Sequence, residues 1–243
     1  MDPLLISAAS GMRARMESLD MLANNMANSG TVGFKTDKEF YSLYQQELPV
    51  IQKQWTDFSQ GTLTPTGNPL DLGLSGNGFF ALNSPNGTIY TRGGQFQLSK
   101  SNQLQTAEGY TLRDVQNKGL PITVDPTQPI DIAKDGTVQQ NGQTVGQIEI
   151  GGIESPAQAL SKLGNSYFIF STQPAQTAPD PATEVHQGTL EQSNVPVADA
   201  AVRLVSIMRQ FEMLQKAMTM GADMNKQRSN RSPKSAEGFR RQK

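Results

Sequence analysis

The sequence predicts an α+β fold, in which N- and C-terminal helices form a coiled-coil-like helical domain and a central, mainly β domain is inserted between them. Proline supports this prediction first, because it disrupts helix interiors and is absent from residues 4–48 and 197–232. All ten methionines lie before residue 27 or after residue 207, whereas most of the 22 glycines lie between residues 61 and 188. Dense glycine disfavours long helices, so we expect strands and turns in the middle.

Each terminal zone carries mainly apolar residues spaced alternately by four and three, which is the repeat of a coiled-coil seam. In the first zone they are Leu5, Ala9, Met12, Met16, Leu19, Ala23 and Met26. In the last zone they are Val197, Ala201, Leu204, Met208, Phe211, Gln215, Met218 and Ala222, with Gln215 as the one polar interruption. Two interpretations stay open: the stripes pair two helices, or each stripe faces the core of its own domain.

The middle of the chain carries short β-prone runs and turn dipeptides. Strands are predicted at residues 79–82, 89–91, 148–150 and 167–170. Turns are predicted at Asn86-Gly87, Asp135-Gly136 and Asn141-Gly142, because these residue types accept a positive φ.

These patterns divide the chain into four predicted segments. Residues 1–60 form an N-terminal helical segment with a following extended region, and residues 61–188 form the central β domain. Residues 189–228 form a C-terminal helical segment that pairs with the first helix. Residues 229–243 are basic and poor in apolar side chains, so a disordered tail is expected there.

Composition argues against several functional classes. Lys and Arg total 21 against 22 Asp and Glu, so no overall charge marks a nucleic-acid binder. Cysteine is absent, which excludes thiol catalysis, and the sole histidine, His186, has no partners for a metal site. We therefore expect no catalytic residue, metal or cofactor, and we expect acidic side chains to be solvated surface charges.

Targeting signals are also missing from the sequence. No apolar run reaches the roughly 18–20 residues of a membrane-spanning helix, so no transmembrane segment is expected. The start Met1-Asp2 lacks the basic region of a secretory signal, so export by the general secretory route is not expected.

Three motifs resemble signatures of the flagellar basal-body rod and hook protein family. The first comprises Ala9, Gly11, Met12, Leu19, Asn24-Asn25, Ala27-Asn28 and Gly33-Phe34-Lys35. The second comprises Gln60-Gly61-Thr62, Thr66-Gly67-Asn68-Pro69-Leu70-Asp71-Leu72, Gly76, Gly78-Phe79-Phe80, Tyr90-Thr91-Arg92-Gly93 and Phe96. The third comprises Gln187-Gly188-Thr189-Leu190-Glu191 and Ser193-Asn194-Val195. The motifs occur in order, and the size and residues 209–213 look more like the proximal than the distal rod protein.

The resemblance implies a non-enzymatic subunit of the periplasmic rod, which assembles helically into a shaft that transmits torque from motor to hook. It implies partners, namely copies of the chain, other rod subunits and the flagellar export apparatus, and no nucleic acid. The stripes then predict an assembly interface of Leu5, Met12, Met16, Leu19, Met26, Ala201, Leu204, Met208, Phe211 and Met218. The alternative is a peptidoglycan-cleaving enzyme acting at the rod, because distant carboxylates can meet in a fold.

Overall fold

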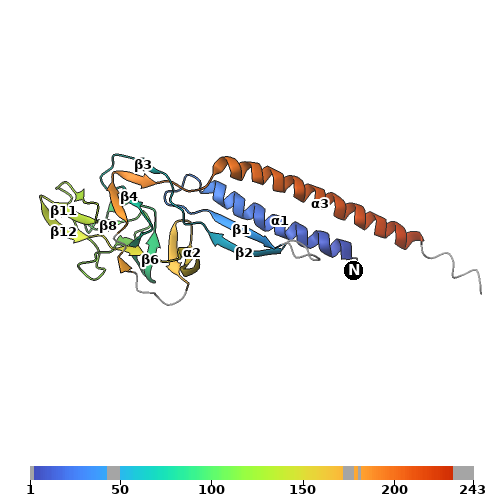
Figure 1. Cartoon of the computed structure of the whole chain (residues 1–243), viewed down its shortest axis with the longest axis horizontal. Coiled ribbons are helices and arrows are strands. Elements are labelled where there is room, and N and C mark those ends of the chain that lie inside the picture. The colour runs from blue at the N-terminus through green and yellow to red at the C-terminus, as the bar shows by residue number, and fades with distance from the viewer. Residues whose placement is uncertain (1–2, 43–49, 172–177, 180–181, 232–243) are drawn as a thin grey trace, which may run out of the picture. The chain divides into compact units, whose positions relative to one another are not determined.

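A computed structural model describes residues 3–42, 50–171, 178–179 and 182–231 (Figure 1). The chain divides into two compact units. The helical unit contains residues 1–24, 38–54 and 197–243, and the β unit contains residues 25–37 and 55–196. Each unit is therefore built from segments that lie far apart in the sequence.

The helical unit contains the two long helices and a two-stranded sheet. Its elements are α1 (Pro3–Ala27), β1 (Asp37–Ser42), β2 (Val50–Thr56) and α3 (Val197–Arg231). In Figure 1, α1 and α3 run side by side in opposite directions. They approach closely at Gly11, where an added Cβ would lie 3.7 Å from Cδ1 of Leu214. The Ser18 hydroxyl donates a 2.9 Å hydrogen bond to Glu39 Oε2, which joins α1 to β1.

The β unit is built from antiparallel sheets. Its strands are β3 (Leu63–Pro65), β4 (Leu72–Ser75), β5 (Phe79–Ser84), β6 (Gly87–Thr91), β7 (Gln97–Leu98), β8 (Leu104–Gln105), β9 (Thr111–Leu112), β10 (Asp131–Ile132), β11 (Thr137–Gln140), β12 (Gln143–Gln147), β13 (Ile150–Gly152), β14 (Leu160–Leu163), β15 (Tyr167–Phe170), β16 (Ala178–Pro179), β17 (Glu184–Gln187) and β18 (Thr189–Glu191). The short helix α2 (Pro156–Ala159) precedes β14.

The largest sheet has nine strands. Seven of them follow the order β14-β15-β6-β5-β9-β8-β7, and the other two are β13, which pairs with β5, and β16, which pairs with β13. A second sheet has the order β10-β11-β12. Two small sheets pair late strands with early ones: β17 with β4, and β18 with β3. The segment that precedes α3 is therefore part of the β unit.

Strand β5 is buried on both faces and separates two apolar clusters. Side chains alternate along a strand, so Phe80 and Leu82 face one cluster and Phe79 and Ala81 face the other. The second cluster includes a set of edge-to-face rings, with Phe79 and Phe168 at a centroid distance of 5.9 Å. Because neither face meets water, residues 79–82 form an unbroken apolar run instead of an alternating one.

The predicted fold class, terminal helices forming a coiled-coil-like domain around an inserted β domain, is wrong. Among the described residues there are three helices, one of them only four residues long, and large antiparallel sheets. Strands β1 and β2 belong mainly to the helical unit, and residues 25–37 belong to the β unit. The buried face of α1 contains small and polar residues, such as Gly11 and Ser18, as well as apolar ones. An apolar heptad pattern therefore does not identify this face.

Most of the local predictions in the middle of the chain are confirmed. Strands β5, β6 and β15 cover the predicted runs, whereas of residues 148–150 only Ile150 belongs to a strand. The backbone has positive φ at Gly87, Gly136, Asn141 and Gly142. The four segment limits stay a prediction, and the predicted tail lies mostly outside the described residues, since α3 extends to Arg231.

Replacing a core leucine of β5 should destabilise the β unit strongly. Leu82 is fully buried, so Leu82→Ala removes buried methyl groups and should lower the free energy of unfolding by about 2–5 kcal/mol. Leu120, with 64% of its surface exposed, is the matched control. Leu120→Ala should change the free energy of unfolding by less than about 0.5 kcal/mol. Urea denaturation measures both. Equal losses would contradict the assigned core.

Candidate functional site: a buried charge junction and two helix faces

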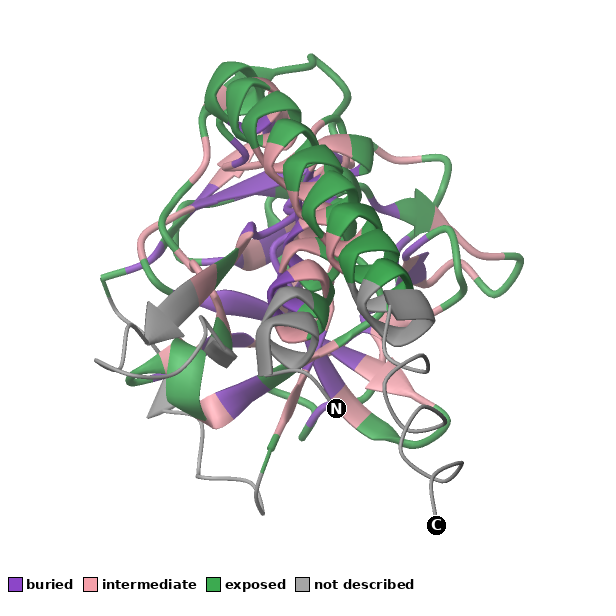
Figure 2. Ribbon diagram, turned by 90° about the vertical axis from the view of Figure 1, so that its right-hand side faces the viewer, coloured by how far each residue is buried: buried purple, intermediate pink, exposed green. Residues whose placement is uncertain are grey.

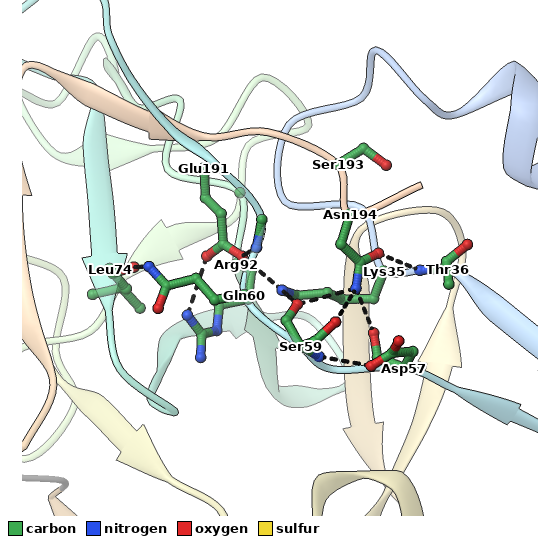
Figure 3. Close-up of polar contacts among 12 residues, drawn as sticks. Lys35, Thr36, Asp57, Ser59, Gln60, Leu74, Arg92, Glu191, Ser193 and Asn194 are labelled. Atoms are coloured by element: carbon green, nitrogen blue, oxygen red, sulfur yellow. Dashed lines mark hydrogen bonds and ion pairs between the residues drawn. The ribbon is translucent and has the colours of Figure 1, made fainter. Parts of the chain in front are cut away.

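Three charged side chains meet in the interior of the β unit, where Glu191 lies between Lys35 and Arg92 (Figure 3). Lys35 Nζ donates to Glu191 Oε1 at 2.6 Å, and Arg92 Nη1 donates to Oε2 at 3.1 Å. The three side chains are at most 1% exposed. Each belongs to a different sequence motif, so the ion pairs join three distant segments of the chain.

Backbone groups complete the coordination of these charges. The Gly61 N–H donates to Glu191 Oε1 at 2.8 Å, while the carbonyls of Ser59 and Gly76 accept from Lys35 and Arg92 at 2.6 and 2.5 Å. A buried ion pair is tolerated only when such hydrogen bonds offset its desolvation. Burial lowers the pKa of Lys35 below its ordinary value, and the adjacent Glu191 carboxylate opposes that shift.

Glycines permit the close backbone approach around this junction. Gly33 has a φ of +68°, and an added Cβ would lie 2.2 Å from the Gly93 nitrogen. At Gly61 an added Cβ would lie 1.9 Å from the Gln192 carbonyl oxygen. The Gly33 N–H also donates to the Glu191 carbonyl at 2.8 Å. These positions need glycine because other backbone segments occupy the space of a side chain.

Asparagine side chains hold the segments next to the junction. Asn194 Oδ1 accepts from the Thr36 N–H at 2.8 Å, and its Nδ2 donates to the Asp57 and Ser59 carbonyls at 2.8 and 3.0 Å. Asn25 exchanges two hydrogen bonds with the Asp37 backbone, at 2.8 and 3.0 Å. An asparagine amide carries both a donor and an acceptor, so it can bond to a backbone as a neighbouring strand would.

Lys162 of strand β14 also holds the segment of residues 33–37. Its Nζ donates at 2.7 Å both to the Lys35 carbonyl and to Asp37 Oδ2, and it lies 4.3 Å from the centre of the Phe34 ring. Burial lowers the pKa of Lys162, and the hydrogen bond to Asp37 opposes this. Residues 33–37 are therefore held by side chains from both β14 and the segment before α3.

Lys35, Arg92 and Glu191 belong to the three sequence motifs, but the motifs did not predict that their charges meet. The expectation that acidic side chains are solvated surface charges is wrong for Glu191, which is fully buried. One signal was available in the sequence: Lys35, Arg92 and Glu191 each stand beside motif glycines or apolar residues. Their meeting across separations of 156 and 99 residues follows from the fold alone.

The predicted interface residues on α1 do not coincide with its buried face. That face contains Gly11, Ala14, Ser18 and Leu22, at spacings of three and four residues. Met12, Leu19 and Met26 are partly buried, and Met16 is 53% exposed. Leu5 lies in α1, but its side chain is outside what the structure describes.

Helix α3 has two apolar faces, and the predicted interface residues lie mainly on the inner one. Ala201, Leu204, Phe211 and Met218 are partly buried, with Ile207 and Leu214, whereas Met208 is 49% exposed. The opposite side, which we term the outer face, consists of Val202, Val205, Met213, Met220 and Met224. These five are 50–71% exposed, and Figure 2 shows α3 exposed along much of its length.

A shallow apolar hollow follows the first half of the outer face of α3. It is lined by Ala201, Val202, Val205, Ser206, Arg209, Gln210 and Met213. Monomeric proteins seldom expose such continuous apolar surface unless it contacts a partner. The outer face is therefore a candidate interaction surface.

Other features suggest no site for chemistry. His186 lies in β17, with Nε2 3.8 Å from Glu184 Oε2 in an exposed setting. Among the described residues no group of His, Cys, Asp and Glu side chains could hold a metal ion. Within the same part of the chain, the helices are too short or too polar to cross a membrane. The junction charges are bonded to one another and join segments of the β unit, which is a structural role.

Comparison with known proteins identifies the family. Residues 5–35 match the family described as flagella basal body rod protein, residues 73–140 match the flagellar hook protein FlgE/F/G D1 domain, and residues 186–231 match the flagellar basal body rod FlgEFG protein C-terminal family. The basal-body rod protein FlgF of Caulobacter vibrioides is 33% identical, over 93% of this chain and 96% of its own length.

Two further similar proteins are also flagellar basal-body rod proteins. The basal-body rod protein FlgF of Mesorhizobium japonicum is 33% identical, over 87% of this chain and 90% of its own. The basal-body rod protein FlgG of Borreliella burgdorferi is 30% identical, over 90% of this chain and 95% of its own length. The chain therefore belongs to the flagellar basal-body rod protein family. It is a structural component of the flagellar basal body and not an enzyme, and nothing in these matches supports a peptidoglycan-cleaving activity.

Removing the charge of Glu191 should be strongly destabilising. Glu191→Gln removes the anion that the buried Lys35 and Arg92 share, so the free energy of unfolding should fall by about 3–5 kcal/mol. Glu184→Gln is the matched control, because Glu184 is half exposed in its pair with Lys134. Its effect should stay below about 1 kcal/mol. Chemical denaturation followed by circular dichroism measures both, and a tolerated Glu191→Gln would refute the junction.

A methyl group at Gly33 should be far more costly than one at Gly30 in the same turn region. Gly33→Ala meets the Gly93 backbone at a positive φ and should destabilise the protein by more than about 1 kcal/mol. Nothing lies within 4 Å of an added Cβ at Gly30, so Gly30→Ala should be neutral within about 0.5 kcal/mol. Thermal unfolding of both variants distinguishes a local clash from a general demand for glycine.

Proposed function

We propose that this chain assembles helically, with copies of itself and with other rod subunits, into the axial shaft that transmits torque from motor to hook. Family membership supports the structural role, and the outer face of α3 supports assembly through that helix. Five apolar side chains on one helix face, each at least half exposed, gain free energy when a neighbouring subunit covers them.

Both terminal helices contribute to this proposed assembly interface. Met16 and Met208 are the most exposed of the predicted interface residues with described side chains, so they are open to a neighbouring subunit. The partly buried Leu204, Phe211 and Met218 pack within the chain and widen the apolar surface at its margin. Methionine is flexible and polarizable, which suits contact with neighbours of slightly different shape.

The charge junction supports a role in carrying load. A shaft transmits torque only if its subunits resist deformation, and the junction bonds three distant segments within the β unit. Asn194 and Lys162 add bonds to residues 35–37, so this segment cannot shift without breaking several hydrogen bonds together. Such a network is stiff because its members are buried and hydrogen-bonded to one another.

The export route and the position in the rod are further parts of the proposal. We expect passage through the flagellar export apparatus, since the chain belongs to the flagellar basal-body rod protein family. A position in the proximal rod is supported by the 33% identity to two FlgF proteins, against 30% to an FlgG protein.

A charge on the outer face of α3 should block assembly without unfolding the protein. Met213 is 63% exposed, so Met213→Asp should keep the unfolding transition of the parent chain. In a strain that lacks the native gene, it should fail to enter basal bodies, because a charge would be buried at the subunit contact. Leu120→Asp is the control, since Leu120 is 64% exposed but lies in the β unit. Normal incorporation of Met213→Asp would exclude this face from assembly.

A further inference from the structure

The methionines of α3 are unequally exposed to solvent. Met213, Met220 and Met224 are 63%, 66% and 69% exposed and share the outer face. Met218 lies between them in the sequence, but it points to the inner face and is partly buried. A fifth methionine of the helix, Met208, is 49% exposed and lies off the outer face. The outer face therefore carries three open thioethers, and Met218 is a shielded thioether on the same helix.

Thioether sulfur is the readily oxidised group of this chain. Cysteine, whose thiolate would otherwise react first with peroxide, is absent from the sequence. In the reaction, the sulfur loses two electrons and forms a bond to one peroxide oxygen as the O–O bond breaks. The other peroxide oxygen leaves as water. The product, methionine sulfoxide, is polar and chiral, whereas the parent side chain is apolar.

We propose that the outer face of α3 is a methionine oxidation site, at which hydrogen peroxide converts Met213, Met220 and Met224 to sulfoxides and thereby weakens subunit assembly. Three of the five side chains that form this face are oxidisable. The resulting sulfoxide oxygens accept hydrogen bonds from water, and a neighbouring apolar surface offers no donor in exchange. The inferred effect on assembly rests on the proposed function, whereas the inferred site of oxidation does not.

The reaction is also reversible, which makes the site a switch and not only a point of damage. Methionine sulfoxide reductases restore the thioether, with one enzyme class for each sulfoxide epimer. Two thiols supply the two electrons and become a disulfide, and the sulfoxide oxygen leaves as water. The charge junction in the β unit contains no sulfur, so peroxide leaves its ion pairs intact. An oxidised chain therefore keeps its fold while its outer face is polar.

The oxidation site is tested by treating the purified full-length chain with a limited dose of hydrogen peroxide and measuring each methionine by peptide mass spectrometry. Met213, Met220 and Met224 should be oxidised several-fold faster than Met218, which serves as an internal control on the same helix. Equal rates, or faster oxidation of Met218, would overturn the assignment.

The consequence for assembly is tested by sedimentation of the chain, with every protein compared with its own untreated sample. Peroxide should reduce the sedimenting fraction of the parent chain, and reductases of both classes should restore it. Met16 and Met208 are 53% and 49% exposed and belong to the proposed interface, so both are also replaced by leucine in the two variants that follow. With that change, the triple variant Met213→Leu, Met220→Leu, Met224→Leu should lose its sensitivity to peroxide, since leucine is not oxidised. Met218→Leu is the matched control and should stay sensitive.

The outcomes separate this inference from the proposed function. Fast oxidation of the outer face with unchanged sedimentation would overturn the switch, and so would persistent sensitivity of the triple variant. Untreated parent protein that never sediments would count against self-assembly, while the mass spectrometry would still decide whether the site exists.

Discussion

The carboxylate of Glu191 is the interaction on which the β unit depends. It bonds both buried cations, Lys35 and Arg92, and it also accepts the Gly61 N–H. Asp57 adds an electrostatic attraction for Lys35, and the Ser59 and Gly76 carbonyl oxygens accept hydrogen bonds from Lys35 and Arg92. Such a group is costly to bury unless all its hydrogen bonds form together, so the junction favours one arrangement of its segments.

This dependence explains why small residues accompany the charges. The ions meet only if their backbones approach closely, and Gly33 and Gly61 leave the necessary room. Asn25 and Asn194 then satisfy backbone groups that no strand partner reaches. In isolation, each of these residue types is typical of a turn, and their structural role appears only when distant segments are considered together.

Sequence patterns predicted local structure better than the way segments combine. The strands at residues 79–82 and 167–170 and the turn at Asn141-Gly142 follow from local residue types, and the structure confirms them. The fold class was mistaken, because apolar spacing cannot reveal that α1 buries Gly11, Ala14 and Ser18 or that residues 25–37 belong to the β unit. The ion junction was missed for a related reason, since its members are distant in the sequence.

The position of Glu191 along the chain sets the order in which the molecule can be completed. Lys35 and Arg92 precede their shared anion by 156 and 99 residues, and the strands that carry or flank it pair with β3 and β4. A chain that emerges N-terminus first therefore exposes Lys35 and Arg92 long before the carboxylate that bonds to both of them. Until residue 191 arrives, a closed interior would hold two uncompensated charges, so an open and hydrated state is favoured for most of the time of emergence.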